Sequence, residues 1–194
     1  MTIDADRSDA DLIARSVREP EAFSTVFDRH FAELLRYVHA RLGPDTAEDV
    51  TSETFLAAFR HRSRYDHAWP DARPWLYGIA SRQIGKHRRA ELRWLRILAT
   101  APPDGPPEDF GDRSAERVAA ERLRPALVAL LSAMKPQDRE LLLLVAWAGL
   151  SYQEAGAALG LTPGAVKARL HRIRVRTRTE LGGADPMDRE LGDE

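Results

Sequence analysis

A basic run near the C-terminus contains the clearest chemistry in the sequence. Between residues 167 and 178, six side chains are Lys or Arg and none is acidic. Cations at this density bind phosphates, and Arg or Lys can also donate hydrogen bonds to base edges in the major groove of DNA. The run therefore predicts a nucleic-acid contact. A basic helix face that meets only solvent is the alternative.

The residues before this run have the pattern of a helix-turn-helix that would position it. Ser151 and Glu154 are spaced as a capping box, which predicts a short helix. Gly160 allows a sharp turn after that helix, because glycine tolerates a left-handed backbone. Thr162 then caps a second helix that has Pro163 in its first position. An ordinary helical hairpin is the competing interpretation.

A second basic run lies between residues 73 and 96, where seven Lys or Arg accompany one acid. The aromatic residues Tyr65, Trp69, Trp75 and Tyr77 lie before it or within it. Aromatic rings among cations suit unpaired nucleic-acid bases, which stack on the rings while the cations hold phosphates. Trp75 is the ambiguous ring, and we expect it in the core, because Ile79 follows it by four residues and that spacing is typical of a helix core.

Four acids form a third group, at Asp45, Glu48, Asp49 and Glu53. Asp45 and Glu48 have the spacing of a capping box, which predicts a helix that begins there. Glu53 follows Glu48 and Asp49 by about one helical turn, so these acids can share one face of the helix. That face could simply be solvated, or its spacing could hold a divalent metal, but no histidine or second carboxylate cluster completes a metal site.

Helices must position these groups, because the composition disfavours strands. Ala and Leu together number 52, against 15 Ile and Val, and unbranched side chains lose little rotamer freedom in a helix. We therefore expect an all-α protein of two small helical domains. A flexible, acidic linker should join them, because residues 99–113 contain four prolines, two glycines and four acids. The expected boundaries are 10–95, a linker at 96–118, 119–182 and an acidic tail at 183–194.

The 194-residue sequence also excludes several classes of protein. It has no cysteine, which removes disulfide scaffolds, thiol catalysis and cysteine-ligated zinc. Its six histidines are scattered and it has no glycine-rich phosphate loop, so we expect no enzyme and no metal or cofactor site. No apolar run is long enough to span a membrane, and the acidic N-terminus differs from a signal peptide. We therefore expect a cytoplasmic protein without membrane insertion.

Two parts of the chain together resemble the sigma-70 family of bacterial RNA polymerase initiation factors, specifically its small extracytoplasmic-function (ECF) group. The segment SYQEAGAALGLTPGAVKARLHRIR at 151–174 resembles the region 4 helix-turn-helix. The segments AEDVTSETFLAAFR at 47–60 and RPWLYGIASRQIGKHRR at 73–89 resemble region 2. Both regions stand in the family's order and spacing, and the regions 1 and 3 of larger sigma factors have no counterpart.

The resemblance implies a subunit that directs core RNA polymerase to specific promoters and helps to melt the −10 element. Residues 10–95 would be region 2 and residues 119–182 region 4, with no catalytic residue in either. Promoter DNA and core polymerase, through its β′ clamp helices and β subunit, would be the partners, and the family commonly also has an anti-sigma factor. A helix-turn-helix regulator that acts without core polymerase is the alternative function.

The resemblance also assigns candidate residues to three surfaces. Polymerase docking would use Asp45, Glu48, Asp49 and Glu53. The −10 element would be contacted by Tyr65, Trp69, Tyr77, Arg82, Lys86, Arg88 and Arg89, with residues 65–73 as the loop that captures a flipped base. The −35 element would be contacted by Lys167, Ala168, Arg169, His171, Arg172 and Arg176.

Three positions depart from the pattern that the family usually shows. Arg82 stands where the family usually has Asn, and a guanidinium cannot reproduce the paired donor and acceptor of an amide, so the base preference should differ. Ala155 and Gly156 replace the usual Ile-Ala, which should loosen the first helix of the motif. Ala165 replaces a common Thr, which removes one hydroxyl contact to the DNA backbone.

Overall fold

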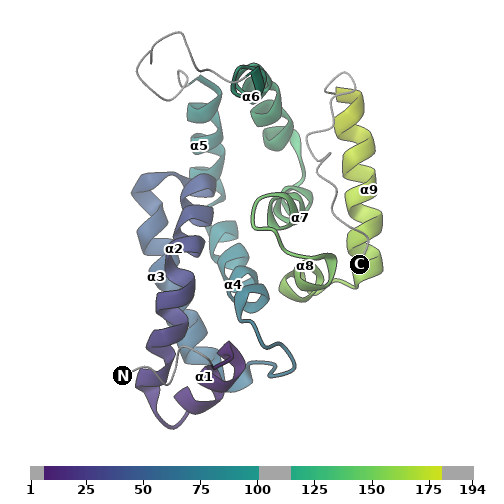
Figure 1. The fold of residues 1–194 in the computed structure, drawn as a ribbon. Helices are drawn as coiled ribbons and strands as arrows, with labels where there is room; N and C mark the ends of the chain where they lie inside the picture. Colours follow the sequence, from purple (N-terminus) through teal and green to yellow (C-terminus); the bar gives the residue numbers. More distant parts are fainter. Residues whose placement is uncertain (1–6, 101–114, 181–194) are drawn as a thin grey trace.

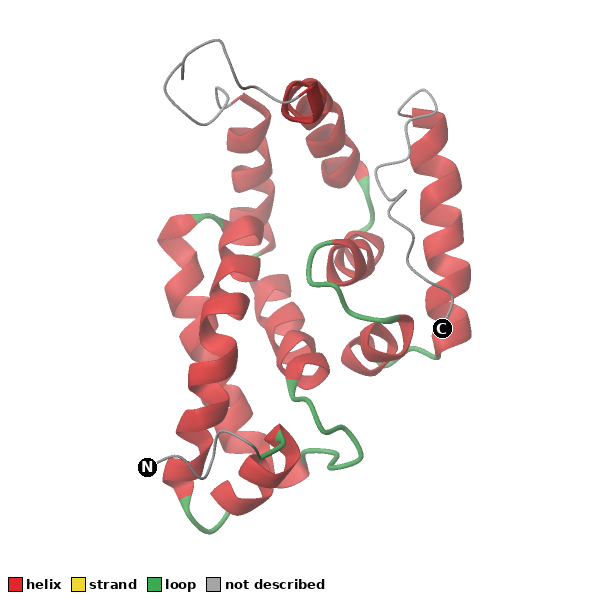
Figure 2. Cartoon of the chain, in the orientation of Figure 1, coloured by secondary structure: helices red, strands yellow, loops and turns green. Residues whose placement is uncertain are grey.

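The computed structural model describes residues 7–100 and 115–180, and the long elements in these ranges are all α-helices (Figures 1 and 2). The expectation of an all-α protein is therefore confirmed. The acidic tail and the proline-rich part of the predicted linker lie outside the described residues. Among the residues that the structure describes, no helix is both long and apolar enough to cross a membrane.

The first block, residues 7–100, is a bundle in which α4 packs against both α2 and α3. Its apolar core is built from side chains at helical spacing, such as Leu34 and Val38 of α2, Val50 of α3 and Leu76 of α4, all of which are buried. The helices of this block are α1 (Asp9–Ser16), α2 (Phe23–Leu42), α3 (Pro44–His61), α4 (Arg73–Lys86) and α5 (Arg88–Thr100).

Gly43 and Pro44 make the sharp turn between α2 and α3. Gly43 has φ +83°, and a Cβ at this position would lie 2.8 Å from the indole of Trp94, so both backbone and space require glycine. Pro44 is the first residue of α3. The capping box predicted at Asp45 and Glu48 is wrong, because the helix begins one residue earlier, after Gly43, and no side chain caps it.

The second block, residues 115–180, places a long C-terminal helix against two shorter ones. Helix α9 contacts both α7 and α8, and it buries Val166, Leu170 and Ile173 there. The helices of this block are α6 (Ala115–Ala133), α7 (Pro136–Ala146), α8 (Tyr152–Leu159) and α9 (Pro163–Glu180).

Three features of the helices differ from expectation. Helix α1 has no counterpart among the predicted elements, although Ser8 caps it by accepting a hydrogen bond from Asp11 N. The second basic run, residues 73–96, is divided between two helices at His87, where α4 ends and α5 begins. Helices also enter the predicted linker from both sides, because α5 continues to Thr100 and α6 begins at Ala115.

The two blocks pack against each other instead of standing apart. Helix α4 contacts α7 and α8, and α5 contacts α6. In Figure 1, α4 lies between the rest of the first block and the second block. The buried apolar residues of both blocks form one continuous cluster. The sequence predicted two domains joined by a linker, and the structure adds an extensive contact between them.

Candidate nucleic-acid interface

The turn between α8 and α9 has the geometry that its residues predict. Ser151 and Glu154 form a reciprocal capping box: Ser151 Oγ accepts from Glu154 N at 3.2 Å, and Glu154 Oε2 accepts from Ser151 N at 2.7 Å. Gly160 ends α8 in the left-handed conformation, with φ +68°. A Cβ on Gly156 would lie 2.6 Å from the carbonyl oxygen of Leu161, so the close approach of the turn needs glycine. The predicted helix-turn-helix is therefore present.

Most of the predicted −35 residues lie on the solvent-facing side of α9. This helix begins at Pro163, and Thr162 Oγ1 accepts a hydrogen bond from Ala165 N at 3.2 Å. Its buried side faces α7 and α8, so the residues between the buried positions point outward. The exposed members of the predicted set are Lys167, Ala168, His171, Arg172 and Arg176.

Arg169, the sixth member of that set, lies at the edge of this surface. Its Nε is 3.6 Å from Asp138 Oδ1 on α7, and its side chain is 27% exposed. Nearby, Arg174 Nη2 donates to the Tyr152 hydroxyl at 3.3 Å. These contacts direct Arg169 and Arg174 toward the body of the second block, so the outward residues carry the positive surface of α9.

A groove of about 380 Å³ between α3 and α4 brings together an aromatic ring and cations. Trp75, Ile79, Arg82 and Lys86 of α4 line it, as does His61 of α3. Trp75 and Arg82 share one side of α4, as their spacing of about two turns predicts. Trp75 is half-buried: it packs against the core, as its spacing to Ile79 predicts, and it also lines the groove.

Three further cations continue this surface beyond the groove. Arg88 and Arg89 are exposed at the start of α5, next to the exposed Lys86 at the end of α4. The three line a hollow of about 630 Å³ around the break between the two helices. The four cations predicted for the −10 element, Arg82 included, therefore lie along one exposed path.

Tyr65 closes the loop that precedes α4. Its hydroxyl donates to the carbonyl oxygen of Trp69 at 2.6 Å and to that of Asp71 at 3.1 Å. Its ring packs edge-on against Trp75, with 4.9 Å between the ring centroids. Burial, with the nearby Asp9 charge, raises the pKa of the Tyr65 hydroxyl. Tyr65 thus stabilises the loop, and its buried ring offers no face to a base.

Tyr77 is buried in the same way. Its hydroxyl donates to Glu33 Oε1 at 3.0 Å, and Arg73 donates to the same oxygen at 2.6 Å. Burial, with the Glu33 charge, raises the pKa of Tyr77. The expectation that Tyr65 and Tyr77 stack on bases does not fit these positions. Trp69, the other aromatic residue predicted on the loop, is half-buried and packs against the core.

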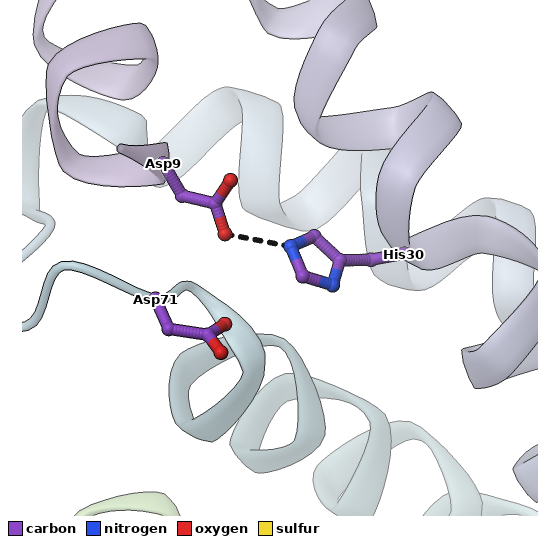
Figure 3. A group of neighbouring side chains, drawn as sticks. All are labelled: Asp9, His30 and Asp71. Carbon is purple, nitrogen blue, oxygen red and sulfur yellow. Dashed lines mark hydrogen bonds and ion pairs between the residues drawn. The ribbon is translucent and has the colours of Figure 1, made fainter. Parts of the chain in front are cut away.

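Helix α1 holds this loop through Asp9, a residue that the sequence pattern did not single out (Figure 3). Asp9 Oδ2 accepts from His30 Nε2 at 2.6 Å and from the backbone N of Ala72 at 3.0 Å. Asp9 Oδ1 accepts from Arg29 at 2.8 Å. A second contact joins the helix to the loop, because Ala10 N donates to the carbonyl oxygen at position 70 at 3.3 Å. We call this set of contacts the Asp9 clasp.

The Asp9 clasp is structural rather than a metal site. Asp9, His30 and Asp71 place one potential ligand atom each within 4.8 Å of one another. However, Arg29 already pairs with Asp9, and Asp71 Oδ1 accepts from Arg73 N at 2.8 Å. Burial alone would raise the pKa of Asp9, but hydrogen bonds from His30, Ala72 and Arg29 outweigh it and lower that pKa from 3.8 to about 2.

The acidic residues predicted for polymerase docking form an exposed surface on α3. The structure places all four at the solvent side of the helix, away from the buried Val50. Leu56 lies close to one turn beyond Glu53 and is 48% exposed. This leucine gives no periodic signal in the sequence, because it is a single apolar residue. A single exposed leucine is ordinary on a protein surface, so the four carboxylates are what distinguishes this side of α3.

Two protein-family models match the chain. Residues 26–94 match sigma-70 region 2, and residues 124–176 match sigma-70, region 4. The first match contains the acidic surface of α3 and the groove between α3 and α4, and the second contains the helix-turn-helix. Helix α1 and Asp9 lie before the first match.

Among curated proteins, the RNA polymerase sigma factor CarQ of Myxococcus xanthus is 33% identical over 169 residues, which cover 84% of this chain and 90% of CarQ. The ECF RNA polymerase sigma factor BldN of Streptomyces coelicolor is 32% identical over 165 residues, covering 84% of this chain and 61% of BldN. The chain therefore spans most of CarQ but less than two thirds of BldN.

Two solved structures share the fold. CnrH, in complex with the cytosolic domain of CnrY, aligns with TM-score 0.62 and 26% identity over 90% of this chain and 97% of CnrH. The sigma factor RpoE of Bartonella quintana, in complex with the anti-sigma factor NepR, aligns with TM-score 0.54 and 19% identity over 82% of this chain and 96% of RpoE. The second likeness concerns the fold alone.

Proposed function

The chain belongs to the ECF group of the sigma-70 family, and from that premise we propose which of its surfaces meets each partner in transcription initiation. It is an RNA polymerase sigma factor, which directs core polymerase to promoters and catalyses no reaction itself. The proposal is that α9 reads the −35 element, that α4 with the loop before it meets the −10 element, and that α3 docks on core polymerase.

The exposed side of α9 supports its assignment to the −35 element. A recognition helix contacts base edges with its N-terminal residues and phosphates with later ones. Lys167 and Ala168 stand in the first turns of α9, and Arg172 and Arg176 follow on the same exposed side. Arg169 must break its ion pair with Asp138 before it can contact DNA. We therefore place Arg169 at the edge of the proposed DNA-binding surface.

The −10 assignment is carried by the groove between α3 and α4. A half-buried Trp75 beside Arg82 and Lys86 joins a stacking surface to phosphate-binding cations, which is the combination that single-stranded bases require. Trp69 on the adjoining loop adds a second ring. Tyr65 and Tyr77 are not included, because their hydroxyls are bonded inside the fold.

The polymerase assignment is carried by the exposed acids of α3 together with Leu56. We propose that Asp49 and Glu53 steer this helix to a basic surface on the β′ clamp helices of core polymerase, with Leu56 packing at the centre of the contact. The cytoplasm, where core polymerase acts, is the proposed location. We also propose that an anti-sigma factor binds this chain, because CnrH is in complex with the cytosolic domain of CnrY and RpoE is in complex with the anti-sigma factor NepR.

In vitro transcription tests the function as a whole. The full chain is added to core polymerase and a genomic fragment library, and the transcript starts are sequenced. We expect starts that share two upstream motifs and that disappear without either protein. DNA binding with no polymerase-dependent start would favour the alternative, a helix-turn-helix regulator that acts without core polymerase.

A further inference from the structure

The loop that precedes α4, residues 65–72, is shaped by hydrogen bonds within itself. Asp66 accepts from Ala68 N at 3.1 Å through its carboxylate and from Trp69 N at 3.1 Å through its carbonyl oxygen. The Tyr65 hydroxyl donates to the carbonyl oxygen of Trp69 as well. These bonds shape a tight turn, and contacts with other elements must fix the position of that turn in the block.

The first two residues of α1 supply three such contacts, spread along the loop. The Ala10 carbonyl oxygen lies 3.3 Å from His67 Nδ1, and Ala10 N donates to the carbonyl oxygen of Pro70 at 3.3 Å. Asp9 Oδ2 accepts from Ala72 N at 3.0 Å. Ala72 directly precedes α4, and its side chain does not cap that helix. Asp9 thus brings a carboxylate to the N-terminal end of α4, where the helix dipole favours a negative charge.

Two side chains of α2 hold the Asp9 carboxylate from its other side. His30 Nε2 lies 2.6 Å from Asp9 Oδ2 (Figure 3), and Arg29 Nη1 donates to Asp9 Oδ1 at 2.8 Å. The Asp9 side chain is 5% exposed, and a change of its rotamer would leave a buried charge unpaired. The Asp9 clasp therefore joins α1, α2 and the start of α4, and it fixes the loop between them.

The outer side of the loop faces solvent beside the groove between α3 and α4. Asp66, His67 and Ala68 are exposed there. The Tyr65 ring of the same loop packs on Trp75, which lines that groove. A shift of the loop would therefore change the groove as well. Recognition sites tolerate displacements of only about 0.5 Å before their geometry is lost.

We propose that Asp9 is a positioning residue for −10 recognition: through the Asp9 clasp it holds the loop in the shape that binds the −10 strand, and it thereby sets the base selectivity of the loop. The inference rests on the proposed assignment of the loop and α4 to the −10 element. Asp9 itself is buried and does not touch DNA. It also lies before residues 26–94, so this selectivity depends on a part of the chain outside the region 2 match.

The physical basis of the proposal is the conformational freedom of the loop. A loop that is already held in its binding shape loses little conformational entropy when DNA binds. A loop released from Asp9 must be ordered first, and it can also adapt its shape to other bases. Loss of the Asp9 clasp should therefore reduce discrimination between bases and not only the output of transcription.

Three variants of the full chain separate this role from a general one. Asp9→Asn removes the negative charge and leaves one oxygen where two now accept hydrogen bonds. Arg29→Gln is a milder change, which removes the Arg29 charge from Asp9 Oδ1 and keeps the Asp9 carboxylate beside Ala72 N. Asp28→Asn, at an exposed position of α2, is the matched control.

Backbone order parameters from NMR relaxation test whether Asp9 holds the loop. We expect amides of residues 66–69 to have values of about 0.85 in the parent and in Asp28→Asn, and below about 0.6 in Asp9→Asn. Arg29→Gln should give a smaller decrease. Val38, in the core of α2, should keep its value in every variant that folds. If Asp9→Asn does not fold, Arg29→Gln decides the result. Unchanged loop values in the folded variants would overturn the proposal.

Run-off transcription over a promoter library randomised in the −10 element tests the effect on selectivity. The −35 element is kept at the sequence found by transcript mapping. A wrong base typically costs about tenfold or more in binding. At one or two −10 positions we expect this ratio to fall to about threefold in Asp9→Asn, and less far in Arg29→Gln, while Asp28→Asn keeps the ratio of the parent. Binding of each chain to the −35 duplex and to core polymerase should not change.

Uniformly lower output with the base preferences of the parent would overturn the proposal, because Asp9 would then contribute to stability alone. Weaker binding to core polymerase or to the −35 duplex in Asp9→Asn would overturn it too, since the defect would extend beyond the loop. If the parent itself supports no transcription, the proposed function is wrong and the selectivity role is wrong with it, while the order parameters still decide whether Asp9 holds the loop.

Discussion

At the scale of single residues, Asp9 shows how a carboxylate positions a loop. It is 4% exposed, yet three donors keep it ionised. A carboxyl whose pKa is lowered by folding adds stability above its unfolded pKa and loses that contribution as the pH falls through its folded pKa. Asp9 should therefore contribute about 2 kcal/mol at neutral pH, and this contribution should vanish between about pH 4 and pH 2.

The substitution Asp9→Asn tests this contribution. Urea unfolding at a series of pH values should show the variant less stable than the parent by about 2 kcal/mol at pH 7, with a difference that shrinks toward zero near pH 2. Asp28→Asn, at an exposed position of α2, is the matched control. A difference that does not depend on pH would show that the Asp9 charge is not what matters.

Arg82 is the residue at which base preference should depart from that of relatives with Asn. It is exposed and lines the groove with Trp75, so its guanidinium can stack on a base or contact guanine or phosphate. We expect Arg82→Asn to change which −10 sequences are opened more than it changes polymerase affinity. Run-off transcription over randomised −10 positions measures this. Uniformly lower output with the same preferences would identify Arg82 as a phosphate anchor only.

The sequence could predict the residues at this scale only where their partners are local. Ser151 and Glu154 are three residues apart, and their capping box was predicted correctly. Asp9 bonds to residues 21 and 63 positions away, and no spacing rule connects them. Tyr65 and Tyr77 were expected at a DNA surface, because composition shows aromatic rings but not which way they point.

At the scale of elements, α3 should act as a docking helix. Reversal of two exposed charges, Asp49→Lys with Glu53→Lys, should weaken binding to core polymerase at least about tenfold, and more at low salt, because like charges would then face each other. Equilibrium binding of labelled chain to core polymerase measures this. The matched control reverses Glu21 and Asp28, which are exposed acids outside α3. Equal losses in the two double variants would remove α3 from the contact.

Helix α9 should divide its residues between bases and phosphates. Lys167→Ala should cost about 1–3 kcal/mol and relax specificity at one or two −35 positions, because Lys167 stands in the first turns. Arg176→Ala should weaken all sequences about equally. Binding of the full chain to a library of −35 duplexes distinguishes the two. Sequence-independent losses at both positions would mean that α9 holds DNA without reading it.

Helix boundaries show why element prediction was incomplete. Gly160 ends α8 through its own backbone properties, so that boundary was predicted from the sequence, whereas the start of α3 at Pro44 was placed one residue too late. The break at His87 was not, because neither a proline nor a glycine stands at that position. The chain changes direction there, and Glu91 of α5 then accepts a hydrogen bond from Arg41 of α2. The break is therefore associated with a tertiary contact and not with a local sequence signal.

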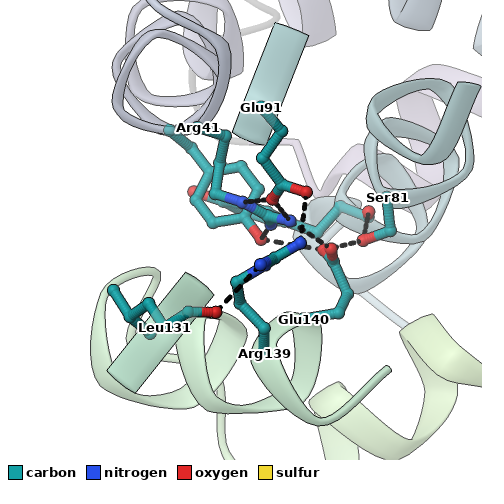
Figure 4. A network of polar contacts seen from close by, with 8 residues as sticks. Arg41, Ser81, Glu91, Leu131, Arg139 and Glu140 are labelled. Carbon is teal, nitrogen blue, oxygen red and sulfur yellow. Dashed lines mark hydrogen bonds and ion pairs between the residues drawn. The ribbon is translucent and has the colours of Figure 1, made fainter. Parts of the chain in front are cut away.

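At the scale of the whole molecule, two buried ion pairs join the blocks: Arg41 with Glu140 and Arg139 with Glu91 (Figure 4). These pairs should make the two blocks unfold together. Calorimetry of the parent should show one transition, with equal calorimetric and van't Hoff enthalpies. In Glu140→Gln the transition should broaden or divide, because each block then loses less when the other unfolds. Glu48→Gln, an exposed change on α3, should leave the single transition intact. Two transitions in the parent would contradict this coupling.

The packing of the blocks could not be predicted from the sequence. Glu140 lies 103 residues from Tyr37 and 59 from Ser81, so no local pattern joins them. In the sequence, Gly78 is recognisable only as a residue with low helix propensity. Its role in the close approach of α4 to α8 depends on the backbone of α8. The residues of the helix-turn-helix, by contrast, are contiguous, and contiguous motifs were the part of the site that could be predicted best.

The exposed acidic side of α3 has a consequence for the order of assembly. The packing of α7 and α8 on the first block covers one side of α4 but leaves the α3 carboxylates exposed to solvent. If both basic helices could bind DNA at the same time, the chain would gain avidity for any duplex. A genome offers millions of such non-specific sites. A chain whose blocks stay packed together would forgo that avidity, while the proposed polymerase-docking surface of α3 stays exposed. Free molecules would therefore stay available to bind polymerase instead of binding non-specifically along the chromosome.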